Sequence, residues 1–432
     1  MTTTSITVPE PSLILLVGPS GSGKSSFARK HFLDTEIISS DRCRALVSDD
    51  ENDQAATKEA FEVLHLIADK RLAAGRLTVI DATNVQPDAR RPLIDLARRH
   101  HIMAVAIVLD LPRDLCLERN LTRPERRLDK RIIWAQADSL RRSLDNLNQE
   151  GLGQVTVLST PEAVDAVQIE RQPLSPDKAF ETGPFDLIGD VHGCFDELHA
   201  LLLKLGYTID GGRGAPWNLS HPQGRKPVFL GDLVDRGPKT PEVLRLVMDM
   251  VDAGTGFCVT GNHDEKLKRA LQGRDVKPSH GLAESLAQLS HETPAFRQRV
   301  IDFIDGLASH YVLDGGRLAV SHAGLKAHYL GRVSPRISRF AMHGQTTGEI
   351  DAFGLPVRQN WAKDYRGEAM LVYGHTPVLE PEWQNHTINI DTGCVFGGKL
   401  TALRYPEKEI IQVDAQRVYV KPPRPISQEG NR

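Results

Sequence analysis

Residues 13–30 read LILLVGPSGSGKSSFARK, and this stretch decides the fold of the first part of the chain. The unbroken apolar run at residues 13–17 predicts a strand buried on both faces, and residues 25–30 predict the opening of a helix. The glycines between them let backbone N–H groups turn inward around a phosphate. Strand, glycine loop and helix in this order predict a P-loop in an α/β domain with a parallel sheet.

The loop supplies the groups that bind ATP and Mg²⁺. Lys24 can reach the β and γ phosphates, and the Ser25 hydroxyl can ligate Mg²⁺. The residues expected to bind the nucleotide are Gly18, Ser20, Gly21, Ser22, Gly23, Lys24, Ser25 and Ser26.

A second predicted strand, residues 36–39, leads into Asp41 and Arg44. Ligands of open α/β sheets bind at the carboxyl ends of the strands, so Asp41 is expected as the general base for an attacking hydroxyl. Arg44 is expected to bind a phosphate of the acceptor. The alternative is a helix N-cap aspartate beside a solvated arginine. Asp81, after the strand at residues 77–80, would support the metal's water shell or cap the next helix.

Cations follow the fourth predicted strand, residues 102–109. In small P-loop kinases such a segment is a lid that neutralises charge on the transferring phosphoryl group. We expect Arg119 to be catalytic and Arg123 to bind substrate, because they lie four residues apart on one helical face. The other cations would belong to a solvated surface. The full set is Arg113, Arg119, Arg123, Arg126, Arg127, Lys130 and Arg131.

A second constellation lies about 170 residues beyond the P-loop, where five predicted strands each end in a potential metal ligand. The mixed nitrogen and oxygen donors suit Mn²⁺, Fe, Ni²⁺ or Zn²⁺, and two such ions can clamp the attacking and leaving oxygens of a phosphoester. Asp232 is suited to bridge the two ions. The expected ligands are Asp190, His192, Asp232, Asn262, His322 and His375.

Residues beside these ligands are candidates for substrate chemistry. Arg236 is placed to hold a phosphate oxygen, and His263 to protonate the leaving group, with Asp264 as its orienting partner. Asp391 is expected to be catalytic, through a hydrogen bond to a ligand histidine or to the leaving group. A plain turn aspartate is the alternative for Asp391.

The motifs DVHG at 190–193, GDLVDRG at 231–237, GNHD at 261–264 and GHTP at 374–377 resemble those of calcineurin-type binuclear metallophosphoesterases. Four further runs resemble bacterial polynucleotide kinase-phosphatase, an RNA end-healing enzyme. They are SSDRCR at 39–44, SDDENDQ at 48–54, NIDTGCVFGG at 389–398 and LTALRYP at 400–406.

This resemblance implies a kinase that moves the γ-phosphate of ATP to a 5′-hydroxyl and a phosphatase that removes 2′,3′-cyclic or 2′/3′-phosphates. It also implies that Asp41 is the general base, that Arg44 contacts the acceptor end and that Arg119 is a lid arginine. The phosphatase metals would be Mn²⁺ or Ni²⁺. Unlike the family enzyme, the sequence contains no Lys-x-Asp-Gly motif of a ligase, so healing without sealing is implied.

Length and composition fit two enzymatic domains. The 432 residues are 40% hydrophobic, and the expected organisation is a P-loop kinase-like domain at 1–170, a linker at 171–183, a metallophosphoesterase α/β sandwich at 184–421 and a disordered tail at 422–432. Five scattered cysteines indicate a reducing compartment. Neither a signal peptide nor a membrane-spanning run is found, so a cytoplasmic protein is expected.

A net charge of −3 does not indicate bulk nucleic-acid binding, but local basic segments suffice for an enzyme that engages only an end. The expected partners are ATP and RNA or DNA ends; a separate ligase and a homodimer stay open. The alternative function is a diadenosine tetraphosphatase or protein phosphatase with an ATP-binding small-molecule kinase or regulatory domain. A non-catalytic, ATP-gated scaffold is a third hypothesis, for which the full ligand set would be superfluous.

Overall fold

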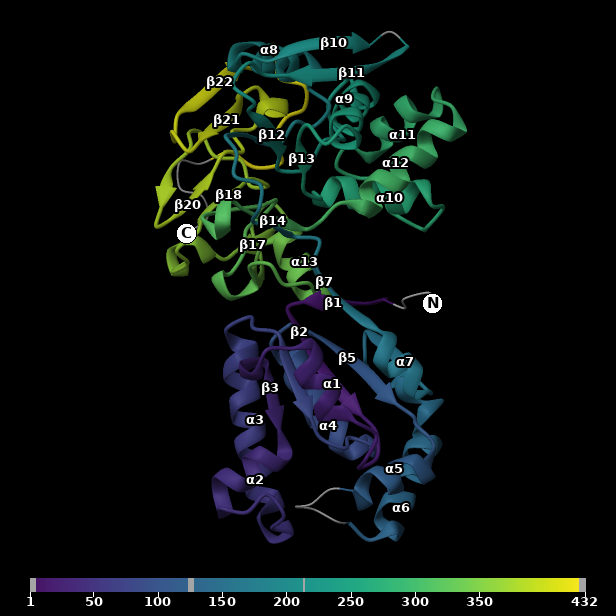
Figure 1. Cartoon of the computed structure of the whole chain (residues 1–432). Helices are drawn as coiled ribbons and strands as arrows, with labels where there is room; N and C mark the ends of the chain where they lie inside the picture. Colours follow the sequence, from purple (N-terminus) through teal and green to yellow (C-terminus); the bar gives the residue numbers. More distant parts are fainter. Residues whose placement is uncertain (1–4, 123–127, 213, 427–432) are drawn as a thin grey trace. The chain divides into compact units, whose positions relative to one another are not determined.

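The computed structural model describes residues 5–122, 128–212 and 214–426. The chain divides into two compact units, Met1–Leu174 and Ser175–Arg432. Each unit has its own sheets (Figure 1). Each also has its own hydrophobic cores.

The first unit is a five-stranded parallel sheet in the order β3-β4-β2-β5-β6. Helices cover both faces of the sheet, so alternate residues of β2 enter two different hydrophobic cores. Leu13 and Leu15 pack with α3 and α4, whereas Ile14 and Leu16 pack with Phe27 of α1. The strands are β2 (Ser12–Val17), β3 (Ile37–Ser39), β4 (Thr78–Asp81), β5 (Met103–Leu109) and β6 (Gln154–Leu158). The predicted P-loop α/β fold is confirmed.

Seven helices of the first unit lie within the described ranges. They are α1 (Lys24–His31), α2 (Ser40–Ser48), α3 (Thr57–Ala73), α4 (Pro87–Arg99), α5 (Arg113–Leu121), α6 (Lys130–Leu144) and α7 (Pro161–Ala166). A separate parallel pair joins β1 (Ser5–Glu10) to β7 (Gln168–Pro173), which brings the two ends of the unit together.

The second unit is a sandwich of two sheets with helices outside. One sheet has the order β13-β12-β9-β21-β22 and the other β19-β20-β18-β15-β14-β8. Leu187 and Val228 from the first sheet and Val320 and Val372 from the second share one core between the sheets. The predicted metallophosphoesterase sandwich is therefore confirmed.

Most strands of the sandwich are short. The strands of the first sheet are β9 (Phe185–Ile188), β12 (Lys226–Phe229), β13 (Phe257–Cys258), β21 (Lys399–Tyr405) and β22 (Ile410–Asp414). Those of the second are β8 (Asp177–Lys178), β14 (His310–Leu313), β15 (Leu318–Ser321), β18 (Met370–Tyr373), β19 (Trp383–Gln384) and β20 (Thr387–Asn389).

The outer layers consist of helices and two hairpins. Ile188 and Phe229 face a core with α8 and α9, and Ala319 and Leu371 face another with α13. The helices are α8 (Phe195–Leu205), α9 (Thr240–Asp252), α10 (Asn262–Leu271), α11 (Leu282–Ser290), α12 (Pro294–Gly306) and α13 (Pro335–His343). The hairpins are β10 (Thr208–Gly212) with β11 (Ala215–Ser220) and β16 (Thr346–Ile350) with β17 (Pro356–Arg358).

The structure describes ordered residues in both the expected linker and the expected tail. Within the expected linker at 171–183, β7 extends to Pro173 and β8 pairs with β14. Of the expected tail at 422–432, residues 422–426 line a pocket, and 427–432 lie outside the described residues. Among the helices of the described ranges, none combines the length and the apolar character needed to cross a bilayer.

Candidate active sites

The P-loop of the first unit adopts a backbone that only glycine tolerates well. Gly21 and Gly23 have φ angles of 86° and 94°, and a Cβ on Gly21 would lie 2.1 Å from the Cys116 carbonyl oxygen. The buried Lys24 ammonium donates to the carbonyls of Gly18 and Pro19 at 2.8 and 2.9 Å. The Lys24 ammonium therefore lies inside the loop, where the sequence predicts a phosphate of the nucleotide.

Arg119 of α5 lies over this loop. A Cβ on Gly23 would be 3.5 Å from Arg119 Nη1, and Arg119 lines a cavity of about 310 Å³ together with Gly21, Gly23 and Ser26. Arg119 therefore lies beside the P-loop, where the sequence predicts a lid cation. The predicted substrate contact of Arg123 lies outside the described residues, as do Arg126 and Arg127.

Asp41 and Arg44 form an ion pair on α2. Arg44 Nη1 donates to Asp41 Oδ1 and to the Glu51 carbonyl, each at 2.8 Å, and the Arg44 residue is only 4% exposed. Arg44 thus orients the Asp41 carboxylate. The helix is capped by the Ser39 hydroxyl, which accepts from Arg42 N, so the N-cap alternative for Asp41 does not hold.

Asp81 ends β4 next to the P-loop. Burial raises the pKa of Asp81, while a hydrogen bond from Ser25 and the charge of Lys24 oppose this rise. The N-cap of the next helix is Gln86, so Asp81 does not cap it. Asp81 is therefore placed beside the expected Mg²⁺ ligand Ser25, in agreement with the water-shell interpretation.

In the second unit, the predicted ligands follow strand ends that converge. β9 and β12 are parallel neighbours in one sheet, and β15 and β18 in the other. Parallel strands present their carboxyl ends at one edge, which brings the loops after them together. His192, Asp232 and His375 have left-handed φ angles of 45°, 47° and 73°. Such strain in non-glycine residues is typical of functional sites.

Asp232 lies at the middle of the candidate metal centre. Its Oδ2 is 3.6 Å from His192 Nε2 and 3.4 Å from His322 Nε2. It belongs to two clusters whose ligand atoms lie within 4.8 Å of one another, His192–Asp232–His263 and Asp232–His322–His375. A carboxylate shared by two clusters is placed to bridge two ions.

Backbone carbonyls fix the orientation of two ligand histidines. His192 Nδ1 donates to Val234 O at 2.7 Å, and His322 Nδ1 donates to Leu230 O at 2.9 Å. Each Nε2 therefore faces the centre, as in histidine ligands held by a second hydrogen bond. His322 Nε2 lies 3.0 Å from Asn262 Oδ1 and 2.9 Å from His375 Nδ1.

Unsatisfied buried atoms indicate that the centre suits divalent cations. Among the described residues, no hydrogen-bond partner is found for Asp190 Oδ1 or His375 Nε2, although both are buried. Burial, together with the charges of Asp391 and Asp232, raises the pKa of Asp190 well above its ordinary value. Two cations held by the six predicted ligands would supply phosphoryl polarisation and an activated water. The nitrogen and oxygen donors fit transition-metal ions.

The electrostatics at Asp232 differ from those at Asp190. Burial raises the pKa of Asp232, but the charges of His322 and His263 outweigh burial and hold this pKa well below its ordinary value. Burial and the charge of Arg236 lower the pKa of His192 well below its ordinary value, which keeps the imidazole neutral. Against the effect of burial, the charge of Asp232 in turn raises the pKa of His322. An ionised Asp232 and a neutral His192 are the protonation states that metal binding requires, and a cation at this centre would have to displace any proton on His322.

His263 and Arg236 face the centre as a hydrogen-bonded pair. Arg236 Nη2 donates to His263 Nε2 at 2.9 Å, and its Nη1 donates to His192 Nε2 at 2.6 Å. His263 Nδ1 lies 2.6 Å from Asp235 Oδ2. The prediction that Asp264 orients His263 is wrong, because the Asp264 carboxylate accepts from the backbone of Leu233 and Gly261 at 3.0 Å each.

Asp391 is buried and is not among the described residues that line the pocket. Its Oδ1 accepts from Gly393 N at 3.0 Å, which is the turn arrangement that the sequence left open. Burial raises the pKa of Asp391 to about 6, and its charge contributes to the raised pKa of Asp190. In the described structure Asp391 therefore acts on Asp190 through its field.

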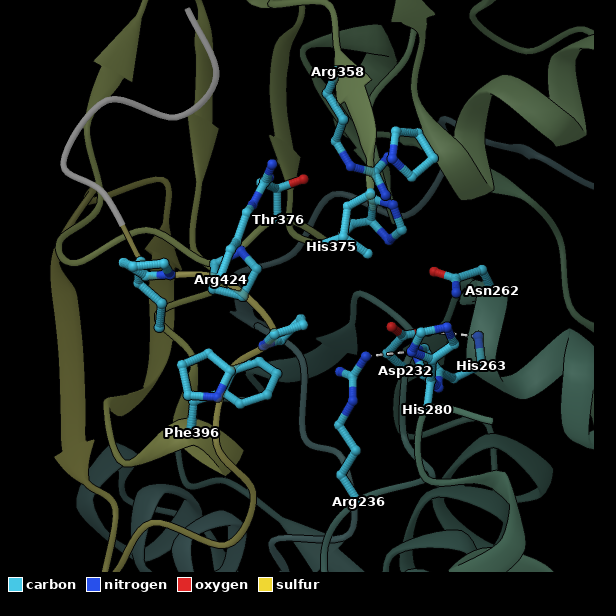
Figure 2. Close-up of a pocket in the computed structure, with 17 residues that line it drawn as sticks. Asp232, Arg236, Asn262, His263, His280, Arg358, His375, Thr376, Phe396 and Arg424 are labelled. Carbon is cyan, nitrogen blue, oxygen red and sulfur yellow. Dashed lines mark hydrogen bonds between the residues drawn. The ribbon is translucent and has the colours of Figure 1, made fainter. Parts of the chain in front are cut away.

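The centre opens into a pocket of about 270 Å³ (Figure 2). Asp232, Arg236, Asn262, His263 and His375 line it among the predicted residues. The Arg236 guanidinium lies 5.2 Å from the Phe396 ring, which holds this arginine over the aromatic face.

Comparison with known proteins agrees with both halves of this description. The AAA domain model matches residues 13–147, and the calcineurin-like phosphoesterase model matches residues 183–379. Bis(5′-nucleosyl)-tetraphosphatase PrpE [asymmetrical] of Anoxybacillus flavithermus is 43% identical over 240 residues, which are 55% of this chain and 96% of that protein. The chain belongs to the calcineurin-like phosphoesterases.

A second relative of the same name, from Geobacillus thermodenitrificans, is 45% identical over 239 residues, with 54% of this chain and 96% of that protein covered. These names agree better with the diadenosine tetraphosphatase alternative than with the end-healing prediction. Sequence reasoning missed several residues of this site. His280, Arg358 and Arg424 line the pocket, and Asp235 contacts His263 without lining it. Asp235 had a signal, since it precedes Arg236 in the same motif; the others come from segments without one.

Proposed function

We propose that this protein hydrolyses bis(5′-nucleosyl) tetraphosphates at the metal centre of its second unit, and that its first unit is an ATP-binding phosphotransferase. The observation that carries the proposal is the position of Asp232, shared by two ligand clusters at the base of a pocket that also contains Arg236 and His263. The names of the relatives support the substrate class.

The side chains suit hydrolysis of a phosphoanhydride. Arg236 donates from both terminal nitrogens toward the centre and can bind the oxygens of the phosphoryl group under attack. His263 Nε2 accepts from Arg236 in this structure. Once Arg236 binds the phosphate oxygens instead, a protonated His263, backed by Asp235, can give its Nε2 proton to the oxygen that departs when the P–O bond breaks. A nucleotide leaving group needs less protonation than an alcohol, so His263 matters most for ester substrates.

A second candidate function is healing of RNA ends, favoured by the geometry of the first unit. Asp41 is fixed by Arg44 at the carboxyl end of β3, the neighbour of β4 in the sheet that carries the P-loop. A carboxylate there can accept the proton of an attacking hydroxyl. With ATP at the P-loop, a 5′-hydroxyl of RNA is one acceptor that this arrangement would serve.

A substrate panel with matched variants tests both candidates. The purified protein is supplied with Mn²⁺, or with Mg²⁺ and ATP, and assayed on diadenosine tetraphosphate, 3′-phosphate RNA, 2′,3′-cyclic-phosphate RNA, 5′-hydroxyl RNA and a phosphopeptide. We expect the highest kcat/KM on the tetraphosphate, abolished in Asp232→Asn and retained in Lys24→Ala. Faster hydrolysis of the RNA phosphates, together with kinase activity lost in Lys24→Ala, would favour end healing instead. Loss of both activities in either folded variant would contradict two independent sites.

A further inference from the structure

The segment at residues 422–426 forms one wall of the phosphoesterase pocket (Figure 2). It follows a fixed anchor, because the amides of Tyr419 and Val420 both donate to the Val395 carbonyl, at 3.1 and 3.2 Å. A Cβ on Gly393 would lie 3.1 Å from Ile426 Cδ1, so Ile426 packs on the turn after Asp391. The segment is thus held against the site at both ends.

The β16–β17 hairpin forms the adjoining wall and is joined to this segment. Arg424 Nη1 lies 3.3 Å from Asp351 Oδ2. The other oxygen of Asp351 accepts from the amides of Phe353 and Leu355 at 2.9 and 2.8 Å, which fixes the hairpin turn. The ion pair therefore holds Arg424 at the pocket from a rigid support.

The hairpin places a second arginine in the same wall. Arg358 Nη1 donates to the His343 carbonyl at 2.5 Å. Burial and the neighbouring charge of Arg424 lower the pKa of Arg358 to about 10. Arg358 and Arg424 enter the pocket from different segments than Arg236 does (Figure 2). Both guanidinium groups line one pocket, and an anion that contacts both would offset the repulsion between their charges.

We propose that Arg424 and Arg358 form a second anion subsite, which binds the phosphates that remain on the departing nucleotide and so selects polyphosphates over phosphomonoesters. The nucleotide in this statement rests on the proposed function; the preference for a polyphosphate chain does not. In the proposed function, the metal centre and Arg236 bind one phosphoryl group. A tetraphosphate has further charged groups, and paired arginines bind phosphate oxygens with directed donors.

The first test uses tripolyphosphate and orthophosphate as inhibitors of p-nitrophenyl phosphate hydrolysis by the whole protein, with free Mn²⁺ held constant. In the wild type, tripolyphosphate should bind more tightly than orthophosphate. In Arg424→Gln, the ratio of the two inhibition constants should fall about tenfold, the loss expected for one charge-assisted hydrogen bond. The ratio for Arg424→Lys should lie between those of the wild type and Arg424→Gln. Arg336→Gln, an exposed arginine of α13 outside the pocket lining, is the matched control and should leave the ratio unchanged.

A second test compares kcat/KM for diadenosine tetraphosphate with that for the aryl phosphate, and this ratio should fall by a similar factor in Arg424→Gln. An inhibition ratio unchanged in Arg424→Gln, or changed equally in Arg336→Gln, would overturn the subsite. If the wild type fails to cleave diadenosine tetraphosphate, the proposed function fails while the inhibitor test still decides the subsite.

Discussion

His263 Nδ1 lies 2.6 Å from Asp235 Oδ2, and both side chains are buried. The two residues come from different motifs, 28 positions apart, and the pair points Nε2 of His263 toward Arg236 and the pocket. A buried carboxylate that accepts from one ring nitrogen fixes the tautomer and orientation of the other. The acid–base candidate at this centre is therefore a dyad rather than a single histidine.

The dyad gives a prediction about leaving groups. His263→Ala should lower kcat for an alkyl phosphate by roughly 10²-fold or more, and that for an aryl phosphate far less, because an aryl leaving group needs little protonation. Asp235→Asn should show the same selectivity with a smaller loss. Steady-state kinetics at constant metal content would measure both. Equal losses on the two substrates would make His263 a structural support.

A second prediction concerns Asp41. If Asp41 accepts the proton of the attacking hydroxyl, Asp41→Asn should lower phosphoryl transfer to the acceptor by roughly 10²-fold, with ATP affinity retained. Because Ser39 rather than Asp41 caps α2, the melting temperature should change little. Radiolabel transfer from ATP and nucleotide titration would check these outcomes. Near-normal transfer would leave Asp41 as the ion-pair partner of Arg44 alone.

The sequence identified both folds and the strand-end ligands for a physical reason. Buried parallel strands are unbroken apolar runs, and residues just after such a run lie at the sheet edge, so Asp232 and His322 could be placed by reading along the chain. Lys24 could be placed because the glycine loop joins such a run to a helix. Contacts between residues far apart in the sequence could not be predicted in this way. Asp264 seemed the partner of His263 by adjacency, yet it lies in the first turn of α10 and turns back to the Gly261 amide.

Arg358 and Arg424 show a different limit of sequence reasoning. Neither lies at the end of a core strand or in a motif, and each reaches the pocket only because its hairpin or terminal segment packs beside it. The proline-rich composition around Arg424 indicated disorder. The packing of Ile426 on Gly393 and the ion pair of Arg424 with Asp351 hold this segment in place, although its local sequence predicts disorder.

A third prediction concerns stability of the second unit. Arg225 is buried and donates to Asp186 Oδ1 at 2.9 Å and to the Phe185 carbonyl at 2.8 Å. Arg225→Ala should lower the free energy of unfolding by about 3 kcal/mol, because the fully buried Asp186 loses its nearer charge partner and keeps only the more distant Arg404, at 3.7 Å. Arg299→Ala, which breaks partly exposed ion pairs, should cost less than about 1 kcal/mol.

This difference can be measured by urea denaturation in a Trp134→Phe background, since the other three tryptophans all lie in the second unit. The change in midpoint then reports that unit. Similar shifts for Arg225→Ala and Arg299→Ala would show that the buried pair contributes no more than a surface one.

The last prediction concerns metal content. Asp232 is the one carboxylate common to both clusters, so Asp232→Asn should weaken both ions, whereas His375→Ala should weaken one. Elemental analysis after dialysis against Mn²⁺ and gel filtration should give about two ions for the wild type, about one for His375→Ala and fewer for Asp232→Asn. Phosphatase activity should fall in both variants on alkyl and aryl substrates alike, because the clamp on the phosphoryl group is lost. His280→Ala, in the pocket wall but outside the clusters, is the control and should retain the metal. Full metal content in Asp232→Asn would contradict a bridging role.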